Sequence, residues 1–400
     1  MPLPIANMKV VLVHNSYQRP GGEDVAFKQE CELLERHGHD VLTYRRSNLE
    51  LQQLRTIERL TLVSRVIAAE DSRLAVLRIL RNEKPDLIHV HNTFMMISPS
   101  IYQACREAQV PVLQTLHNFR LLCPASIFFR DGRRCEECVE HSLWRGVWHG
   151  CYRDSHTATA TIALMLQWHR ARGTWDESVD GYIALSDFSR KKFVDGGLPA
   201  EKISVKPNFV YPDPGERNAP GHYGLFVGRL SAEKGLSTLL TAWQHSRSSI
   251  PLVIVGDGPL RAALEAQAAT NGQAQVTFRG WLNPTETRAA MKQAAFLVLP
   301  SVCYENFPMT IAESFACGTP VLCSRLGAMQ ELVADQHTGL HFTPGDAEDL
   351  ASKLEWASDH PSELGAMGRE ARREYEARYT PEQNYSHLMH IYEQALNAHA

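Results

Sequence analysis

The sequence predicts an α/β protein built from two doubly wound domains. Short apolar runs of strand length alternate with amphipathic helical stretches along most of the chain, which is typical of parallel sheets covered by helices. Residues 209–222 interrupt this alternation with three prolines and two glycines, a composition typical of a linker. A length of 400 residues also favours two domains over one.

These observations set the expected domain boundaries. We expect a first domain over residues 1–208 and a second over residues 223–380, joined by the linker. A cysteine-rich insertion at about 120–175 enlarges the first domain, because this stretch lacks a regular apolar pattern. An apolar stripe at helical spacing from Tyr385 to Leu396 predicts a closing helix over residues 381–400.

Composition and charge exclude several classes of function. The net charge is -4, so the chain lacks the basic footprint of a nucleic-acid-binding protein. No apolar run approaches the roughly 20 residues that a transmembrane helix needs. The N-terminus lacks the basic start and apolar core of a signal peptide. We therefore expect a cytoplasmic protein whose nine cysteines are mostly reduced thiols.

The first domain begins with a strand, a glycine-containing loop and a helix. Gly21 and Gly22 lie in the loop, and the helix is expected from about Glu23 to His37. Phosphate-binding loops occur at this position, but tight turns use Gly-Gly as well. The predicted strands of this domain are Val10–Val13, Val41–Tyr44, Pro85–Asn92, Val110–Leu116, Gly181–Leu185 and a short one from Ile203.

Two histidines follow strands of the first domain. His91 ends one predicted strand and His117 follows the next, so both are expected at the carboxyl edge of the sheet, where ligands bind in doubly wound folds. Imidazole is suited to hydrogen bonding or proton exchange near neutral pH. The alternative is that each is an ordinary structural residue with satisfied hydrogen bonds.

Residues 50–82 predict a helical stretch with a basic face. Apolar residues recur at helical spacing, and the other faces carry arginines. Such a stretch can rest on an anionic membrane surface. The alternative is a solvated arginine face paired with acidic side chains. The apolar residues are Leu54, Ile57, Leu60, Val63, Ile67, Leu74 and Leu77, and the arginines are 55, 59, 65, 73, 78 and 81.

The insertion contains four cysteines with metal-ligand spacing. Cys123, Cys135, Cys138 and Cys151 form a Cys-x11-Cys-x2-Cys-x12-Cys pattern, and the central pair has the knuckle spacing of zinc sites. Four thiolates would close the coordination sphere, which indicates a structural zinc rather than a catalytic one. Free thiols or a redox disulfide are the alternatives.

Tryptophans gather in the same insertion. Trp144, Trp148, Trp168 and Trp175 occur among arginines, which suits an acceptor or membrane face. Core packing is the expected role for most of them.

The second domain repeats the alternation of strands and helices. Its predicted strands are Leu225–Val227, Leu252–Val255, Val276–Arg279, Ala295–Leu299 and Val321–Ser324. After the first of these strands come Gly228, Arg229 and Lys234, a glycine with two cations that can grip phosphate oxygens. After the fourth strand, Glu305 lies in a loop, and Glu313 lies about one turn into a helix that starts near Pro308 or Met309.

Three motifs in this order resemble one enzyme family. They are Gly-Arg-Leu-x-x-x-Lys-Gly from Gly228, Val-Gly-Asp-Gly-Pro from Val255, and the pair Glu305 and Glu313 separated by seven residues. The set resembles the retaining GT-B glycosyltransferases of the family 4 type, the glycosyl transferases group 1. The resemblance implies a GT-B fold, in which two Rossmann-like domains face a cleft and the C-terminal helix crosses back to the N-terminal domain. It also implies transfer of a sugar from a nucleotide-diphosphate sugar to an acceptor hydroxyl.

The resemblance assigns roles on the donor side. Arg229 and Lys234, beside Gly228, would hold the diphosphate, so no catalytic metal is expected. Glu313 would take the ribose hydroxyls and Glu305 would face the donor sugar. The base would lie against the segment that contains Trp281.

The remaining assigned roles lie on both sides of the predicted cleft. Gly21 and Gly22 would approach the donor diphosphate and the acceptor, and His117 would contact the donor sugar. The family usually has Glu-Gly-Phe-Gly where this chain has Glu-Asn-Phe-Pro at 305–308, so one backbone contact can be absent. The other donor-binding positions of the motif are Asn306, Phe307 and Thr310.

Substrates and the competing functions stay open at this level. We favour a UDP-sugar donor, with a GDP-sugar next, and a glycan or lipid-linked acceptor in polysaccharide or glycolipid synthesis, with contact to the inner face of the membrane. One alternative is a nucleotide-sugar epimerase on the same fold, which needs no acceptor. The other is a zinc-stabilised scaffold without activity.

Overall fold

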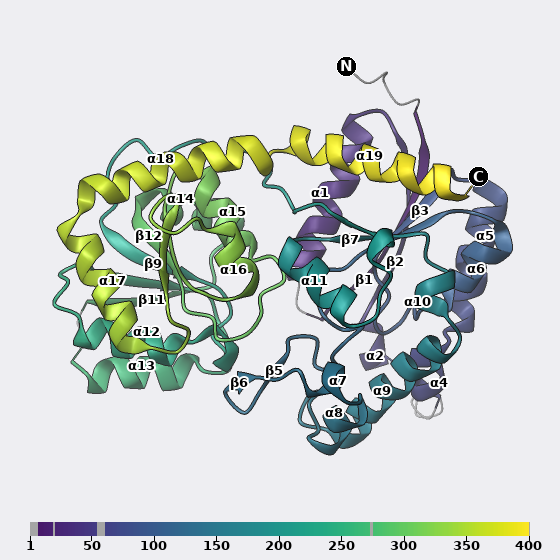
Figure 1. The fold of residues 1–400 in the computed structure, drawn as a ribbon, viewed down its shortest axis with the longest axis horizontal. Coiled ribbons are helices and arrows are strands. Elements are labelled where there is room, and N and C mark those ends of the chain that lie inside the picture. The colour runs from purple at the N-terminus through teal and green to yellow at the C-terminus, as the bar shows by residue number, and fades with distance from the viewer. Residues whose placement is uncertain (1–6, 19–20, 54–60, 273–274, 400) are drawn as a thin grey trace. The chain divides into compact units, whose positions relative to one another are not determined.

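The computed structural model describes residues 7–18, 21–53, 61–272 and 275–399 (Figure 1). The chain divides into two compact units. The first unit contains Met1–Ile127, Glu136–Pro207 and Asn384–Ala400. The second unit contains Phe128–Cys135 and Asn208–Gln383.

The sheet of the first unit has six parallel strands in the order β2-β1-β3-β4-β7-β8. All strands predicted for this half are present. The inner strands β3, β4 and β7 are buried along their whole length, as expected inside a parallel sheet, and the edge strand β2 is partly exposed. Their bounds are β1 Lys9–Ser16, β2 Asp40–Ser47, β3 Leu87–Asn92, β4 Val112–Thr115, β7 Gly181–Ala184 and β8 Ile203–Val205.

Two helices cover one face of this sheet. Side chains alternate along a strand, so Val10 and Leu12 of β1 share a face, and both are completely buried. They pack with α1 (Gly22–Arg36) and with α19 (Pro381–His399), which contributes Leu388 and Tyr392 to the same apolar cluster. The predicted apolar stripe of the closing helix is therefore confirmed, and Figure 1 shows α19 in yellow beside α1.

The predicted helical stretch 50–82 is not one helix. It contains α2 (Glu50–Gln53), α4 (Leu62–Ile67) and α5 (Glu70–Glu83), and the chain leaves the helical conformation at Ala68. There the buried Ala69 donates its backbone N–H to the Ser98 hydroxyl at 2.8 Å instead of continuing the helix. Of the residues named in this stretch, the following lie outside the described ranges: Leu54, Arg55, Ile57, Arg59 and Leu60.

Two arginines of this stretch have acidic partners within it. Arg65 forms an ion pair with Asp71. Arg73 lies 2.6 Å from the carboxylate of Glu70. These pairs match the prediction of a solvated arginine face for the two residues concerned.

The insertion is more regular than we expected. It contains a 16-residue helix, α9 (His156–Ala171), whose first turn is capped by the Ser155 hydroxyl. Its many Ala and Thr residues hide the helical period, which is why the sequence pattern failed to predict it. The other elements here are α7 Glu137–Glu140, α8 Trp144–Trp148, α10 Thr174–Glu177 and the hairpin strands β5 Phe129–Arg130 and β6 Arg133–Arg134.

The expectation that most insertion tryptophans are core residues is wrong. Trp175 is buried, but Trp148 is 80% exposed and Trp144 and Trp168 are each 48% exposed. Trp144 and Trp148 belong to the short helix α8, and Trp168 belongs to α9.

The second unit contains a six-stranded parallel sheet in the order β11-β10-β9-β12-β13-β14. The five predicted strands are present, and β14 is an additional one that the sequence did not predict. The bounds are β9 Tyr223–Val227, β10 Leu252–Val255, β11 Val276–Gly280, β12 Ala294–Leu299, β13 Val321–Ser324 and β14 Gly339–Phe342.

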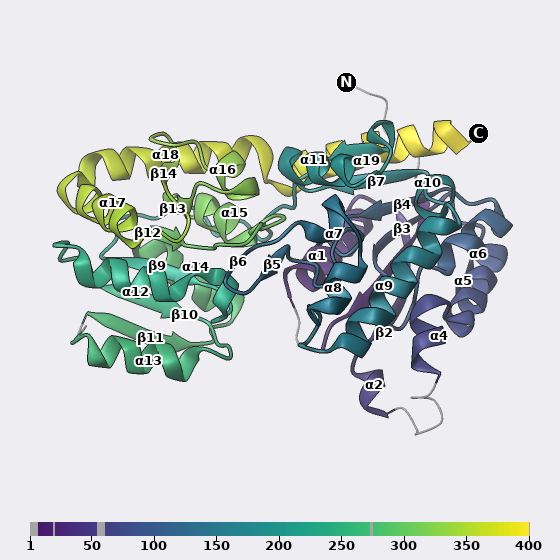
Figure 2. The same cartoon turned by 60° about the horizontal axis from the view of Figure 1, so that its bottom comes forward.

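Helices connect these strands on both sides of the sheet (Figure 2). They are α12 Leu236–His245, α13 Arg261–Thr270, α14 Pro284–Gln293, α15 Met309–Ala316, α16 Gly327–Leu332, α17 Ala347–Asp359 and α18 Pro361–Arg378. The remaining helices, in the first unit, are α5 and α6 (Ile101–Ala108), which pack on each other, and α11 (Asp187–Asp195).

Both sheets contain a topological switch point. In the second unit the strand order reverses between β9 and β12, and in the first unit it reverses between β1 and β3. Ligands of doubly wound folds bind at the carboxyl ends of the strands on either side of such a reversal. The residues that follow these four strands are therefore the ones to inspect for a site.

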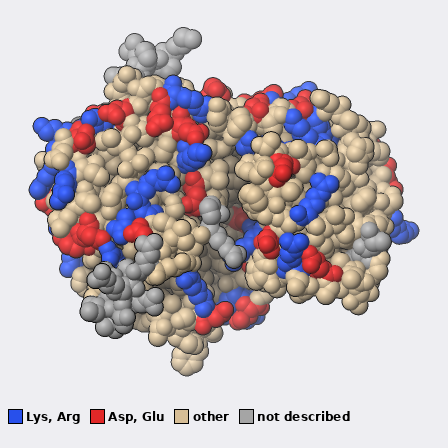
Figure 3. Space-filling model, turned by 180° about the vertical axis from the view of Figure 1, so that it is seen from behind, with Lys and Arg blue, Asp and Glu red and all other residues tan. Residues whose placement is uncertain are grey.

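Surface charge shows no single-sign field on the face displayed in Figure 3, where basic and acidic side chains are interspersed. Among the described residues, no helix is long and apolar enough to cross a bilayer.

Candidate active site

A partly buried ion pair occupies the switch point of the second unit. The Lys234 ammonium lies 2.5 Å from a carboxylate oxygen of Glu305, and the Ser301 hydroxyl donates to the same oxygen at 2.7 Å. Lys234 follows β9, and Ser301 and Glu305 follow β12, so the pair joins the two strands on either side of the reversal.

Gly235 explains how the two loops come so close. Its φ is +69°, and a Cβ built there would lie 2.0 Å from the carbonyl oxygen of Pro300 at the end of β12. Only glycine tolerates both the left-handed backbone and that approach. The Lys-Gly sequence is therefore a packing requirement as well as a source of charge.

The environment keeps both members of the pair ionised. Burial alone would raise the pKa of the Glu305 carboxyl, but the Lys234 ammonium and the Ser301 hydroxyl outweigh it and the pKa is lowered. Burial would likewise lower the pKa of Lys234, and Glu305 outweighs it so that the pKa is raised. The structure thus brings together two of the predicted site residues as a charged pair.

Arg229 lies five residues before Lys234 in the sequence, directly after Gly228, and its side chain is exposed. The Val-Gly-Asp-Gly-Pro turn supports this segment: a Cβ at Gly256 would lie 1.8 Å from the Gly228 carbonyl oxygen. The Gly258 backbone makes a similarly close approach to Leu230. This middle motif therefore has a structural role.

The helix that carries Glu313 begins as predicted. Pro308 has extended backbone and α15 starts at Met309, so Glu313 lies one turn into the helix. Its side chain is half-buried, and burial raises the pKa of its carboxyl against the opposing effect of Arg288. The Phe307 ring packs edge-on against Tyr379, with 5.9 Å between the ring centroids.

Two further aromatic residues belong to this unit. Trp281, predicted to lie beside the base, follows β11 and is 73% exposed. Tyr304, directly before Glu305, contacts the β5–β6 hairpin: its ring centroid lies 6.2 Å from that of Phe128, and the Arg134 guanidinium lies over it. No local sequence pattern predicts this hairpin contact, because the two segments are far apart along the chain.

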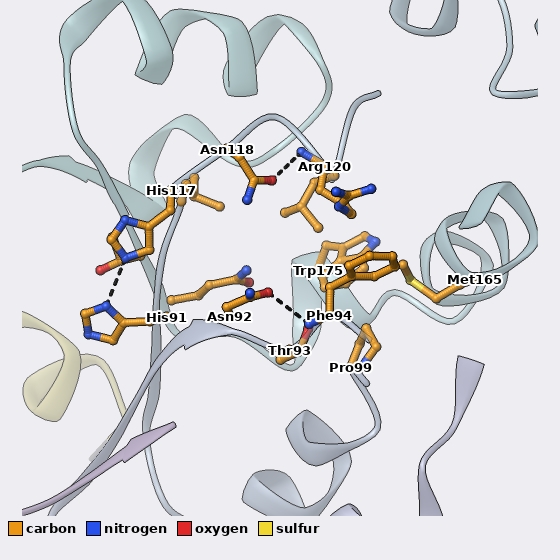
Figure 4. A pocket seen from close by; sticks show the side chains of 14 residues that line it. His91, Asn92, Thr93, Phe94, Pro99, His117, Asn118, Arg120, Met165 and Trp175 are labelled. Atoms are coloured by element: carbon orange, nitrogen blue, oxygen red, sulfur yellow. Dashed lines mark hydrogen bonds between the residues drawn. The ribbon is translucent and has the colours of Figure 1, made fainter. Parts of the chain in front are cut away.

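The first unit contains a pocket at the carboxyl ends of β3 and β4 (Figure 4). His91 and Asn92 line it from β3, His117 and Asn118 from the segment after β4, and Trp175 from α10. Both predicted histidines thus lie at one site. Their rings are stacked, and His91 Nδ1 lies 2.9 Å from His117 Nε2.

Glu23 is a residue of this site that we did not predict. Its carboxylate accepts hydrogen bonds from the side-chain amides of Asn92 and Asn118, each at 3.1 Å. Burial raises the pKa of this carboxyl to about 7. The available signal was its position, directly after Gly21 and Gly22 at the start of α1.

Among the described residues, none requires a glycine at position 21. The φ of Gly21 is -126°, which any residue adopts, and within the described part of the chain a Cβ there would meet only the Asp24 carboxylate, at 4.0 Å. A glycine at such a position is suited to close approach of a ligand.

A second buried carboxylate lies beneath the histidines. Glu30 of α1 accepts from the Lys206 ammonium at 2.9 Å and contacts His89 and His91 at 3.0 and 3.1 Å. The ligand atoms of Glu30, His89 and His91 lie within 4.8 Å of one another, a spacing that a metal ion could use. A cation would have to compete with the Lys206 ammonium for Glu30, so we assign the group as a hydrogen-bonded network.

Segments that carry cysteines converge around Gly146 of α8. A Cβ there would lie 3.2 Å from Cys138 Sγ and 3.3 Å from Pro124, the neighbour of Cys123. The Cys151 backbone N–H donates to the Gly146 carbonyl at 3.0 Å. Cys135 precedes Cys138 by three positions and closes the base of the hairpin.

Comparison with known proteins matches both halves of the chain. The family "Glycosyltransferase Family 4" matches residues 20–213, and "Glycosyl transferases group 1" matches residues 213–374. The 2-deoxystreptamine glucosyltransferase of Streptomyces kanamyceticus is 30% identical over 310 residues, which cover 74% of each chain. The glycogen synthase of Mycobacterium tuberculosis is 28% identical over 310 residues, which cover 75% of this chain and 66%, just under two thirds, of the synthase.

The structure of this chain also resembles experimentally solved structures. The Anabaena protein HepE in complex with UDP aligns with a TM-score of 0.67 and 19% identity, covering 96% of this chain and 99% of HepE. At this identity the likeness shows the fold alone, two Rossmann-like domains that each contain a parallel sheet, which is the GT-B fold.

Proposed function

We propose that this chain, which belongs to the GT-B glycosyltransferases of the family 4 type, transfers a sugar from a nucleoside-diphosphate sugar to an acceptor hydroxyl with retention at the anomeric carbon. The observation that carries the proposal is the Lys234–Glu305 pair at the switch point of the second unit. An ammonium is suited to binding a diphosphate and a carboxylate to binding sugar hydroxyls, and this pair holds the two groups within one hydrogen bond of each other.

The roles of the donor-side residues follow from their chemistry. Arg229 and Lys234 would bind the diphosphate and stabilise the charge that grows on it as the bond to the anomeric carbon breaks. Glu305 would orient the hydroxyls of the sugar, and Glu313 would accept hydrogen bonds from the ribose. The bond to the acceptor oxygen would form on the same face, and the acceptor proton would pass to the leaving phosphate oxygen.

The surrounding positions would complete the donor site. The exposed ring of Trp281 offers a stacking surface for a base, and UDP is our first choice because the structural relative HepE was solved with UDP. GDP is the second choice. Asn306, Phe307 and Thr310 belong to the same loop and helix start as Glu305 and would shape the pocket around the sugar.

The first unit would supply the acceptor side. Its pocket presents amide, hydroxyl, guanidinium and imidazole groups, which suit a hydroxyl-rich ligand. His117 would contact the donor sugar, and the loop at Gly21 and Gly22 would lie against the diphosphate. A glycan or lipid-linked glycan is the acceptor class that we propose.

Two further parts of the proposal concern the insertion. We propose a structural zinc bound by Cys123, Cys135, Cys138 and Cys151, supported by their spacing along the sequence. Its contribution would be to the stability of the insertion, and no step of sugar transfer involves it.

We also propose that the insertion contacts an anionic membrane surface. The exposed Trp148 and Trp168 are residues that favour the bilayer interface, and Arg172 lies 4.5 Å over the ring of Trp168. Helix α9 carries no Asp or Glu, so it adds no charge that would be repelled by anionic lipids.

The decisive experiment is an assay with UDP- and GDP-sugars, with and without an acceptor alcohol, read by NMR of the product. Transfer with the anomeric configuration of the donor is expected. An inverted linkage would contradict retention. Conversion of the donor alone would indicate the epimerase instead, and neither reaction nor nucleotide binding would indicate a scaffold.

A further inference from the structure

Four buried polar side chains form one line across the first unit. The Lys206 ammonium donates to Glu30 at 2.9 Å, the other Glu30 oxygen lies 3.1 Å from His91 Nε2, and His91 Nδ1 lies 2.9 Å from His117 Nε2. The line starts just after β8, passes through α1 and β3, and ends in the pocket of Figure 4, where His91 and His117 are joined by a dashed line.

The charge states along this line are set by its surroundings. Burial alone would raise the pKa of Glu30, but Lys206, His89 and His91 outweigh it and the pKa is lowered well below its usual range. Burial lowers the pKa of His91 to about 4 and that of His117 well below its usual range. At neutral pH Glu30 is therefore a carboxylate, and each of the two rings carries a single N–H.

Hydrogen bonding then determines which nitrogen carries each proton. An ionised carboxylate only accepts, so His91 must hold its proton on Nε2, facing Glu30. Its Nδ1 is then an acceptor, and the bond to His117 requires that His117 Nε2 be the donor. The remaining nitrogen, His117 Nδ1, has no proton and can only accept.

We infer that Glu30 is a positioning residue for His117: acting through His91, it holds the His117 ring in the tautomer that offers Nδ1 as a hydrogen-bond acceptor to a hydroxyl group. Glu30 is not among the residues that line the pocket. The identity of that hydroxyl as one of the donor sugar depends on the proposed function, but the tautomer does not.

The other groups around Glu30 agree with this assignment. His89 Nδ1 lies 3.0 Å from the same Glu30 oxygen and 2.9 Å from the Tyr392 hydroxyl, and its Nε2 faces the Thr115 hydroxyl at 2.8 Å. A proton on His89 Nδ1 satisfies Glu30, and Thr115 can donate to Nε2. Neither contact supplies a proton that would move the His91 proton from Nε2 to Nδ1.

Lys206 keeps Glu30 ionised, and α19 holds Lys206. The Asn384 side chain of α19 accepts from the Lys206 ammonium at 3.1 Å and donates to the Pro207 carbonyl at 2.6 Å. Without this cation the buried carboxyl would take up a proton, and a protonated Glu30 could donate to His91 and reverse the order of donors.

The test uses the full chain with 15N-labelled histidine. Long-range 1H–15N spectra distinguish protonated from bare ring nitrogens, and the His117 and His91 signals are assigned with His117→Asn and His91→Asn. We expect His117 with Nε2 protonated and Nδ1 bare. A proton on His117 Nδ1 would overturn the inference.

Two variants test the role of Glu30. Glu30→Leu combined with Lys206→Met removes the charge pair without leaving an unpaired buried charge, and it should give His117 as a mixture of tautomers. The conservative Glu30→Gln, which keeps the shape of the side chain, is the second variant and should shift the same signals. An unchanged His117 tautomer in both folded variants would overturn the inference. Glu35→Gln, on the exposed side of α1, is the matched control.

Two further measurements are needed: one shows that each variant is folded, and the other shows whether the tautomer of His117 affects sugar transfer. His39, whose Nδ1 accepts from the Met8 N–H at 3.1 Å, should keep its signals in every variant that is folded. Loss of the His117 contact should lower kcat for sugar transfer about tenfold, the effect of one hydrogen bond, with little change in KM for the donor. A wild-type chain with the expected tautomer but no transfer activity would contradict the proposed function and leave the inference intact.

Discussion

Lys234 and Glu305 are 71 positions apart in the sequence, yet their charged atoms lie 2.5 Å apart at the point where the strand order of the second unit reverses. The glycine after Lys234 makes this possible, because it lets the loop after β9 touch the end of β12. The charge pair and the close backbone contact therefore depend on the same dipeptide.

Glu305→Gln should lower sugar transfer without removing nucleotide binding. The amide keeps the size of the side chain but loses the charge that holds Lys234, so kcat should fall by about 100-fold. Kinetic assays with saturating donor measure this. Glu355→Gln, which removes an exposed ion pair with Arg247 in the same unit, should leave kcat unchanged. An equal rate for Glu305→Gln and wild type would remove Glu305 from catalysis.

Glu313→Ala should weaken the binding of the nucleotide. Thermal shifts with UDP, GDP and ADP should show stabilisation by one of them, since a ligand at 100 times its Kd contributes about 2.7 kcal/mol. The shift should shrink in Glu313→Ala, because the hydrogen bonds to the ribose are lost. Glu363→Ala on exposed α18 is the control. Identical shifts in wild type and Glu313→Ala would place the nucleotide elsewhere.

Glu23 should make stability depend on pH. Its pKa is about 7 in the folded chain against an ordinary value of 4.5, so the folded state binds more protons between these values. Stability should therefore fall as pH rises from about 4.5 to 7, and Glu23→Gln should lack this fall. Melting temperatures at pH 5 and pH 8 measure it, with a difference of a few degrees expected. Parallel curves for the two proteins would contradict the raised pKa.

Trp148→Ala and Trp168→Ala should weaken binding to vesicles that contain anionic lipid. The rings are the exposed apolar groups of α8 and α9, and the nearby arginines should make binding sensitive to salt. Co-sedimentation measures the bound fraction. Val25→Ala, at an exposed apolar residue on α1, should bind as wild type does. If wild type fails to bind anionic vesicles, the membrane proposal is wrong.

Purified protein should contain about one zinc ion per chain, the content of a closed four-cysteine site. Elemental analysis by mass spectrometry measures it. Cys138→Ser should lose the ion and melt at a lower temperature, because metal binding contributes to folding. Cys31→Ser, a half-buried cysteine on α1, should keep it. A metal-free wild type with an unchanged melting temperature after chelation would rule zinc out.

The sequence predicted those features that local patterns determine. Strands such as β10 are continuous apolar runs, and the donor-side residues follow such strands at fixed spacings. Helix α9 and strand β14 were missed, because Ala and Thr hide the period of the first and the second is a four-residue run. The partners of Glu23 and Glu30 could not be predicted, since β3, the segment after β4, β8 and α19 meet only in the folded unit.

The β5–β6 hairpin has a consequence for recombining this protein with its relatives. Phe128, which is only 1% exposed, and the rest of residues 128–135 belong to the second unit, although the flanking chain belongs to the first. The second unit is therefore not one continuous stretch of the gene. An exchange of residues 208–383 alone would pair a foreign Tyr304 loop with the resident hairpin, so a chimera designed for a new donor must carry both segments.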